Sequence, residues 1–94
     1  MRLIFSPDVQ RICLERGGEG LGFSIVGGYG TPHGNLPIYV KNVFEAGAAA
    51  SDGRLRRGDR LIAVNGLSFD SVTHDEAVAI LKNSTGVIEL AVLS

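Results

Sequence analysis

Gly20-Leu21-Gly22-Phe23 leads directly into a short strand-like run, Ser24-Ile25-Val26. Because glycine has no Cβ, glycines at alternate positions let successive backbone N–H groups turn toward one side of the chain. Such a nest of N–H groups binds an anion. The neighbouring Leu21, Phe23 and Ile25 are apolar, which favours the carboxylate at the end of an apolar peptide over a phosphate.

Nucleotides and nucleic acids are poor candidates for this loop. A dinucleotide fingerprint needs a further glycine where Ile25 stands, and it needs a helix where the residues favour a strand. No Walker motif is present in the sequence. Nine Lys and Arg against ten Asp and Glu give a net charge of −1. This balance argues against a binder of the nucleic-acid backbone.

Length and composition predict one small globular domain. The chain has 94 residues, of which 45% are hydrophobic and 20% charged. The single cysteine, Cys13, cannot form an internal disulfide, and no Cys or His residues have metal-ligand spacing. No apolar run approaches the length of about 18 residues that crosses a bilayer. We therefore expect an intracellular domain with no metal and no cofactor.

Alternating polar and apolar residues, and in Arg60–Val64 a continuous apolar run, predict five strands. These cover Arg11–Glu15, Phe23–Val26, Pro37–Val43, Arg60–Val64 and Val87–Leu93. In the third strand, Ile38 and Val40 should face the core, with Tyr39 and Lys41 on the opposite face. Asn65-Gly66 is the favoured pair for a tight primed turn. The 13 glycines are clustered, so they predict loops of special geometry between the strands.

One segment, Thr73–Lys82, is clearly helical. Thr73 as N-cap and Glu76 three residues later fit a capping box. Acidic residues at the start of the segment and Lys82 at its end also suit the helix dipole. A second, much shorter helical turn is expected at Gly47–Ala50.

The apolar residues of the long helix form two stripes. Ala77 and Ile80 form one stripe, which suits the core. His74, Val78 and Leu81 form the other, and a histidine at its head is unusual for a row that faces a core. The second stripe is therefore a candidate binding surface.

Three motifs in this order resemble a PDZ domain over about Arg11 to Leu93. They are Arg16 four residues before Gly20-Leu21-Gly22-Phe23, the segment Gly58–Gly66, and the helical segment Thr73–Leu81. The residues of these motifs are similar to those of domains in multi-PDZ scaffolds of cell junctions and synapses. The resemblance implies an α+β, mainly β fold: a five- to six-stranded antiparallel, partly open barrel with two helices.

The resemblance also implies a binding mode. A ligand peptide would add as an antiparallel strand between Phe23–Val26 and the helix that starts at His74. The N–H groups of Leu21, Gly22 and Phe23 would hold its terminal carboxylate, with Arg16 helping through water. The pocket for the last side chain would be lined by Leu21, Phe23, Ile25, Val78 and Leu81.

His74 would set the peptide class. It would accept a hydrogen bond from a Ser or Thr hydroxyl two residues before the terminus, which is the class I preference of the family. The implied ligand is Ser/Thr-x-Val/Leu/Ile with a free carboxylate. Ser24, Val26 and Lys41 would contact the peptide upstream of these residues.

The expected partners are the C-terminal tails of membrane receptors, channels or adhesion proteins, and other PDZ domains or scaffold proteins. Nucleic acid is not expected. The basic stretch of Arg54, Arg56, Arg57 and Arg60 favours at most weak contact with lipid headgroups. The implied location is cytoplasmic, at the inner face of the plasma membrane or at cell junctions. Residues 1–10 lie outside the resemblance and are interpreted as an N-terminal extension, with the domain at 11–94.

Two other functions compete with this one. Ser24, Cys13, His33 and His74 are nominal nucleophiles and bases, but Ser24 lacks the second glycine of a nucleophile elbow. Asp75, next to His74 on a helix, points to a different face and cannot orient that ring. We therefore expect no enzyme. A module that pairs through its sheet edge with a hairpin of another domain remains a second alternative.

Overall fold

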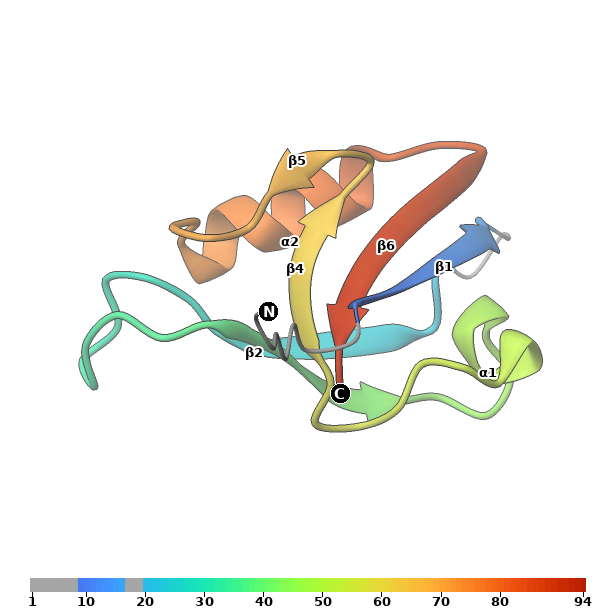
Figure 1. The fold of residues 1–94 in the computed structure, drawn as a ribbon, viewed down its shortest axis with the longest axis horizontal. Coiled ribbons are helices and arrows are strands. Elements are labelled where there is room, and N and C mark those ends of the chain that lie inside the picture. Colours follow the sequence, from blue (N-terminus) through green and yellow to red (C-terminus); the bar gives the residue numbers. More distant parts are fainter. Residues whose placement is uncertain (1–8, 17–19) are drawn as a thin grey trace, which may run out of the picture.

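The computed structural model describes residues 9–16 and 20–94, and its elements alternate strands with two helices (Figure 1). In chain order these are β1 (Val9–Glu15), β2 (Phe23–Gly27), β3 (Ile38–Val43), α1 (Ala48–Asp52), β4 (Arg60–Val64), β5 (Leu67–Ser68), α2 (His74–Asn83) and β6 (Val87–Leu93). The fold is α+β and mainly β, as the sequence predicts.

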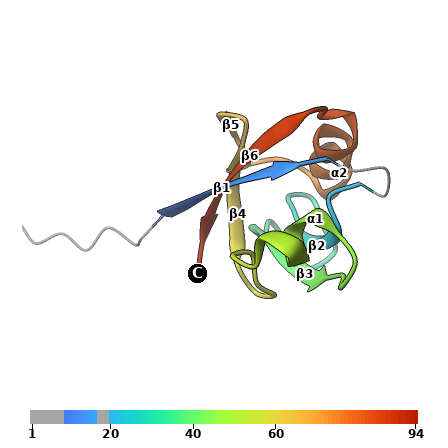
Figure 2. The ribbon, with the colours of Figure 1, turned by 90° about the vertical axis from the view of Figure 1, so that its right-hand side faces the viewer.

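The six strands form one antiparallel sheet that does not close on itself. Their order is β1-β6-β4-β3-β2, with β5 paired to β4. Within the described residues, β1 and β2 therefore lie at the two ends of this order. Figure 2 shows the twist of the sheet, with β1 and β6 crossing β4 and the β2–β3 hairpin below α2. Helix α2 contacts β2, so one edge of the sheet runs beside this helix.

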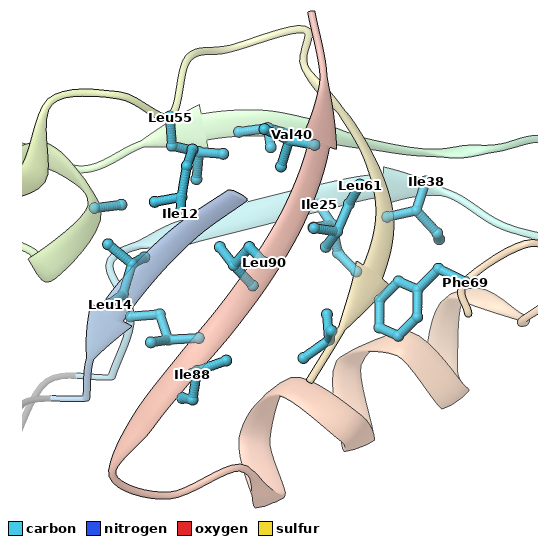
Figure 3. Close-up of a cluster of buried hydrophobic side chains, with 14 of the residues drawn as sticks. Ile12, Leu14, Ile25, Ile38, Val40, Leu55, Leu61, Phe69, Ile88 and Leu90 are labelled. Carbon is cyan, nitrogen blue, oxygen red and sulfur yellow. The ribbon is translucent and has the colours of Figure 1, made fainter. Parts of the chain in front are cut away.

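The core is mostly aliphatic, includes the buried ring of Phe69, and draws on every long strand (Figure 3). Ile38 and Val40 are buried while Tyr39 and Lys41 are exposed, which confirms the predicted alternation of β3. Cys13 lies on the exposed face of β1. The largest fully buried side chains are Ile12, Ile38, Val40, Leu61, Val64, Ile88, Leu90 and Val92.

Helix α2 begins as predicted. The hydroxyl of Thr73 accepts from the N–H of Glu76 at 3.1 Å, and a carboxylate oxygen of Glu76 accepts from the N–H of Thr73 at 2.8 Å. The two bonds satisfy N–H groups that a helix start otherwise leaves unpaired. The turn after β4 is also confirmed, because Asn65 and Gly66 have φ of 51° and 79°.

Several details differ from the sequence-based predictions. Strand β1 starts at Val9 rather than Arg11, because Val9 already pairs with Leu93 of β6. The two-residue strand β5 is too short to give a recognisable pattern, and α1 covers Ala48–Asp52 instead of 47–50. Ile80 packs against the core as predicted but stays half-buried, whereas Ala77 is fully buried. Residues 1–8 of the expected N-terminal extension lie outside the described residues.

The arginines of the turn before β4 interleave with acids. Arg54 donates to Asp52 from Nε at 2.9 Å and to the carbonyl of Arg11 at 3.3 Å. The hydrogen bond from the Arg54 side chain lowers the pKa of the Asp52 carboxyl. Asp59 is buried and accepts from the N–H of Arg56 at 3.0 Å. In the part of the chain that the structure describes, no helix is long and apolar enough to span a membrane.

Candidate functional site

A cavity of about 350 Å³ lies between β2 and α2. Nine of the residues predicted from the sequence line it: Arg16, Leu21, Gly22, Phe23, Ser24, Ile25, His74, Val78 and Leu81. Gly20, Phe44 and Lys82 complete the lining. We call this cavity, together with the open edge of β2, the groove.

The loop Gly20–Phe23 closes one end of the groove and presents N–H groups to it. The carbonyl of Leu21 accepts from the N–H of Ala49 at 3.0 Å, and that of Gly22 accepts from Phe44 at 2.8 Å. In a trans peptide the C=O and the following N–H point in opposite directions. The N–H groups of Gly22 and Phe23 therefore point away from α1 and toward the groove.

The strand register agrees with this orientation. Phe23 lies opposite Val43, but the hydrogen bond beside them joins Phe44 to Gly22. Phe23 and Val43 are thus a pair without mutual hydrogen bonds, and the polar backbone groups of Phe23 face the open edge of β2. Because backbone groups alternate in direction along a strand, the N–H and C=O of Ile25 also face the open edge of β2. The edge of β2 can accept another strand.

Backbone contact with the turn before α1 fixes the loop. Gly22 has φ of +83°, which residues with a Cβ rarely adopt. A Cβ on Gly22 would lie 2.5 Å from Cα of Gly47, and a Cβ on Gly47 would lie 2.4 Å from Cα of Gly22. The two glycines therefore meet backbone to backbone. Neither position has room for a side chain while the loop keeps this shape.

His74 stands at the other end of the groove, on the first turn of α2. Its Nδ1 lies 3.1 Å from the carbonyl oxygen of Gly27. A carbonyl can only accept, so Nδ1 carries the proton, and in the neutral ring Nε2 is left as a hydrogen-bond acceptor. Gly28 packs against this turn, since a Cβ on Gly28 would lie 2.5 Å from the backbone nitrogen of His74. The end of β2 and the start of α2 are thereby held together.

Arg16 links the loop to the far end of α2. Its Nη1 donates to the carbonyl of Leu81 at 2.6 Å and to that of Ser84 at 3.2 Å. A cation at the C-terminal end of a helix complements the helix dipole. Arg16 also lines the groove, and the guanidinium has further donors, so a water-mediated contact with a carboxylate is compatible with these bonds.

The charge of the lining suits an anion at this end. Arg16 and Lys82 are its charged side chains, and the described lining includes no Asp or Glu. Lys82 was not predicted from the sequence, although its position four residues after Val78 places it on the same face of α2. Phe44 was also missed, because a single aromatic residue in a loop gives no pattern.

Val26 and Lys41 lie outside the lining of the cavity, on the exposed face of the β2–β3 hairpin. Val26 pairs with Tyr39, and Ser24 pairs with Asn42. The register shifts between these pairs, so Lys41 is the extra residue of a bulge. Lys41 therefore lies between the Ser24–Asn42 pair and the Val26–Tyr39 pair.

The described residues of the groove assemble neither a metal centre nor a catalytic pair. Among residues 9–16 and 20–94, no group of three His, Cys, Asp or Glu side chains is placed to hold a metal ion. Ser24 and His74 both line the groove, but His74 is oriented by a backbone carbonyl rather than by a carboxylate. Cys13 and His33 do not reach it.

The family model for the PDZ domain matches residues 11–93. The chain is a PDZ domain. The human Multiple PDZ domain protein is 67% identical to it over 88 residues, which are 94% of this chain and 4% of that protein. Disks large homolog 2 of Rattus norvegicus is 54% identical over 86 residues, or 89% of this chain and 10% of that protein.

A solved PDZ structure has the same fold. The second PDZ domain of Dlg1 from the choanoflagellate Monosiga brevicollis superimposes with a TM-score of 0.86 at 41% identity, covering 93% of this chain and 99% of that one. PDZ domains are non-catalytic interaction modules that bind the C-terminal peptides of partner proteins. The groove is the candidate site for such a peptide.

Proposed function

We propose that this PDZ domain binds C-terminal tails of the form Ser/Thr-x-Val/Leu/Ile, with the tail added to β2 as an antiparallel strand. The observation that carries the proposal is the hydrogen bond between His74 Nδ1 and the Gly27 carbonyl, because it leaves Nε2 as an acceptor facing the tail. Strand addition of this kind takes its affinity from the backbone and its specificity from alternate side chains.

An antiparallel tail places its C-terminus at the start of β2. Its carboxylate then meets the N–H groups of Leu21, Gly22 and Phe23, with Arg16 and Lys82 nearby. The last side chain enters the apolar part of the groove between Ile25, which is 8% exposed, and the half-buried Val78 and Leu81. Burial of one aliphatic side chain contributes about 1.5–3 kcal/mol, so Val, Leu or Ile is favoured there.

Side chains alternate along an added strand, so the third residue from the end faces the groove on the same side as the last. That residue lies along β2 toward Gly27, where the His74 ring is fixed. A hydroxyl at this position donates to Nε2, whereas an aliphatic side chain leaves Nε2 without a partner. The ring therefore selects Ser or Thr at the third residue from the end.

Replacing His74 should remove this selection. We expect His74→Ala to weaken binding of a tail with Thr at the third residue from the end by about tenfold to 100-fold, because the hydroxyl is left desolvated and unpaired. His74→Val should shift the preference toward Val at that position. The measurement is a fluorescence titration of both variants and the wild type with a Thr tail and a Val tail.

The tails must differ at that residue only, and a circular dichroism melt shows whether each variant is folded. A wild-type domain that binds the two tails equally contradicts the class I assignment. The same holds if His74→Ala keeps the wild-type ratio of affinities.

Lys41 should favour an acidic residue at the fourth position from the end. On an added strand this side chain lies on the exposed face of the hairpin, on the row of Val26, and Lys41 is attached beside that row. We expect Glu there to bind about 1.5- to 5-fold more tightly than Gln, since exposed ion pairs are weak. The advantage should fade in 1 M salt. A preference for Glu that survives in Lys41→Ala removes Lys41 from the site.

We further propose where such tails come from. The cytoplasmic ends of membrane receptors, channels and adhesion proteins present free carboxylates of this kind. Binding them would place the domain at the inner face of the plasma membrane or at cell junctions. Similarity to the Multiple PDZ domain protein and Disks large homolog 2 supports an assignment to a scaffold with several PDZ domains.

A further inference from the structure

We propose that Phe44 reads the penultimate residue of the tail, so that the domain prefers a large aromatic side chain there. The sequence motif Ser/Thr-x-Val/Leu/Ile leaves this residue open. The inference rests on the proposed strand addition at β2. It adds a specificity determinant that neither the carboxylate loop nor His74 provides.

Phe44 is an exposed aromatic residue with a fixed backbone. It is 52% exposed, although it follows directly after β3. Its N–H donates to the Gly22 carbonyl at 2.8 Å, which ties it to the loop that receives the carboxylate. It also contributes to the lining of the groove, together with Gly22 and Ser24. A phenyl ring that is open to solvent therefore borders the groove at its carboxylate end.

The register of the hairpin shows which face the ring belongs to. Ser24 lies opposite Asn42, and directly opposite residues of an antiparallel pair share one face of the sheet. Phe44 stands two residues after Asn42 and so lies on the same face, one row nearer to the loop. Ser24, Asn42 and Phe44 thus lie on the outer face of the hairpin, away from the buried Ile25.

An added tail presents its penultimate side chain to this outer face. If the last residue lies beside Phe23, the penultimate residue lies beside Ser24, and the alternation directs its side chain outward. Gly22 lies between the added tail and Phe44, and it has no side chain. Ser24 is small as well. A large side chain can therefore lean across Gly22 and meet the ring.

The chemistry of this contact favours an aromatic partner. Two aromatic rings in offset or edge-to-face contact contribute beyond the apolar area that they bury. An alanine or glycine at the penultimate position is too short to cross Gly22. We therefore expect tails ending in Thr-Trp-Val to bind about threefold to tenfold more tightly than tails ending in Thr-Ala-Val.

The test compares these two tails on the wild type, Phe44→Ala and Phe44→Leu. Phe44→Ala should bind both tails equally within about 1.5-fold, because no ring is left for the tryptophan to contact. Phe44→Leu should keep an intermediate preference, because it retains apolar area without the ring. Tyr39→Ala is the matched control, since Tyr39 is an exposed aromatic on the same face of β3 but pairs with Val26 further along.

Each outcome decides the proposal. A Trp preference that is lost in Phe44→Ala and kept in Tyr39→Ala supports it. An unchanged preference in Phe44→Ala, an equal loss in Tyr39→Ala, or no preference in the wild type overturns it. Failure of the underlying binding mode is distinguishable, because the wild type would then bind neither tail. Should Phe44→Ala fail to fold, Phe44→Leu and the wild-type ratio still decide.

Discussion

A tail peptide that ends in an amide should bind at least about 100-fold more weakly than the same peptide ending in a free acid. The loop presents the N–H groups of Gly22 and Phe23 to the groove, and Arg16 and Lys82 are the charged side chains beside it. Hydrogen bonds to a charged group contribute about 1.5–3 kcal/mol each. Amidation removes both the charge and one acceptor oxygen.

The acid peptide should have a Kd in the micromolar range, since ordering a flexible tail offsets much of the contact energy. The amide would then bind with a Kd of about 100 µM or weaker. The measurement is isothermal titration of the two peptides, and an N-terminally acetylated acid is the control, expected to bind like the parent. Equal affinities for acid and amide would exclude the loop as a carboxylate site.

Most of the site follows from local patterns in the sequence. Alternation in β3 placed Ile38 and Val40 inside and Lys41 outside, because each side chain of a half-buried strand responds to the face that it occupies. The capping box located the first turn of α2, and with it the ring of His74. Glycines at 20 and 22 indicated the loop, since their positive φ values are open mainly to that residue.

The rest depends on contacts between distant segments. Arg16 donates to a carbonyl that is 65 residues further along the chain, and backbone acceptors leave no trace in side-chain patterns. Phe44 reaches the groove because the pairing of β3 with β2 continues beyond the end of β3, from Phe44 to Gly22. The core stripe of α2 is narrow: Ala77 is fully buried, while Ile80 packs against the core and stays half-buried. Helical periodicity gives the direction of a stripe but not its width.

Val78→Glu should reduce peptide binding by more than about 100-fold while the domain stays folded. Val78 lies at the middle of α2, lines the groove and is only half-buried. A glutamate there fills the apolar end of the groove with a charged group, and its carboxylate stands near the carboxylate of the tail. We expect a lower melting temperature but a cooperative transition, because the new side chain can turn toward solvent.

Two neighbouring positions separate binding from folding with the same substitution. Ala79 is exposed on α2, so Ala79→Glu adds the same charge to the same helix and should keep the affinity within about twofold. Ala77 is 0% exposed, so Ala77→Glu buries an unpaired charge and should unfold the domain. That cost reaches several kcal/mol, against a total stability of about 5–15 kcal/mol for a domain.

The three variants are compared by titration with the Thr-x-Val tail and by thermal denaturation followed by circular dichroism. The orientation of α2 predicts three different outcomes, namely a folded non-binder, a folded binder and an unfolded chain. If Val78→Glu melts as early as Ala77→Glu, Val78 belongs to the core and not to the groove. If Ala79→Glu abolishes binding as well, charge on the helix rather than occupation of the groove prevents the tail from binding.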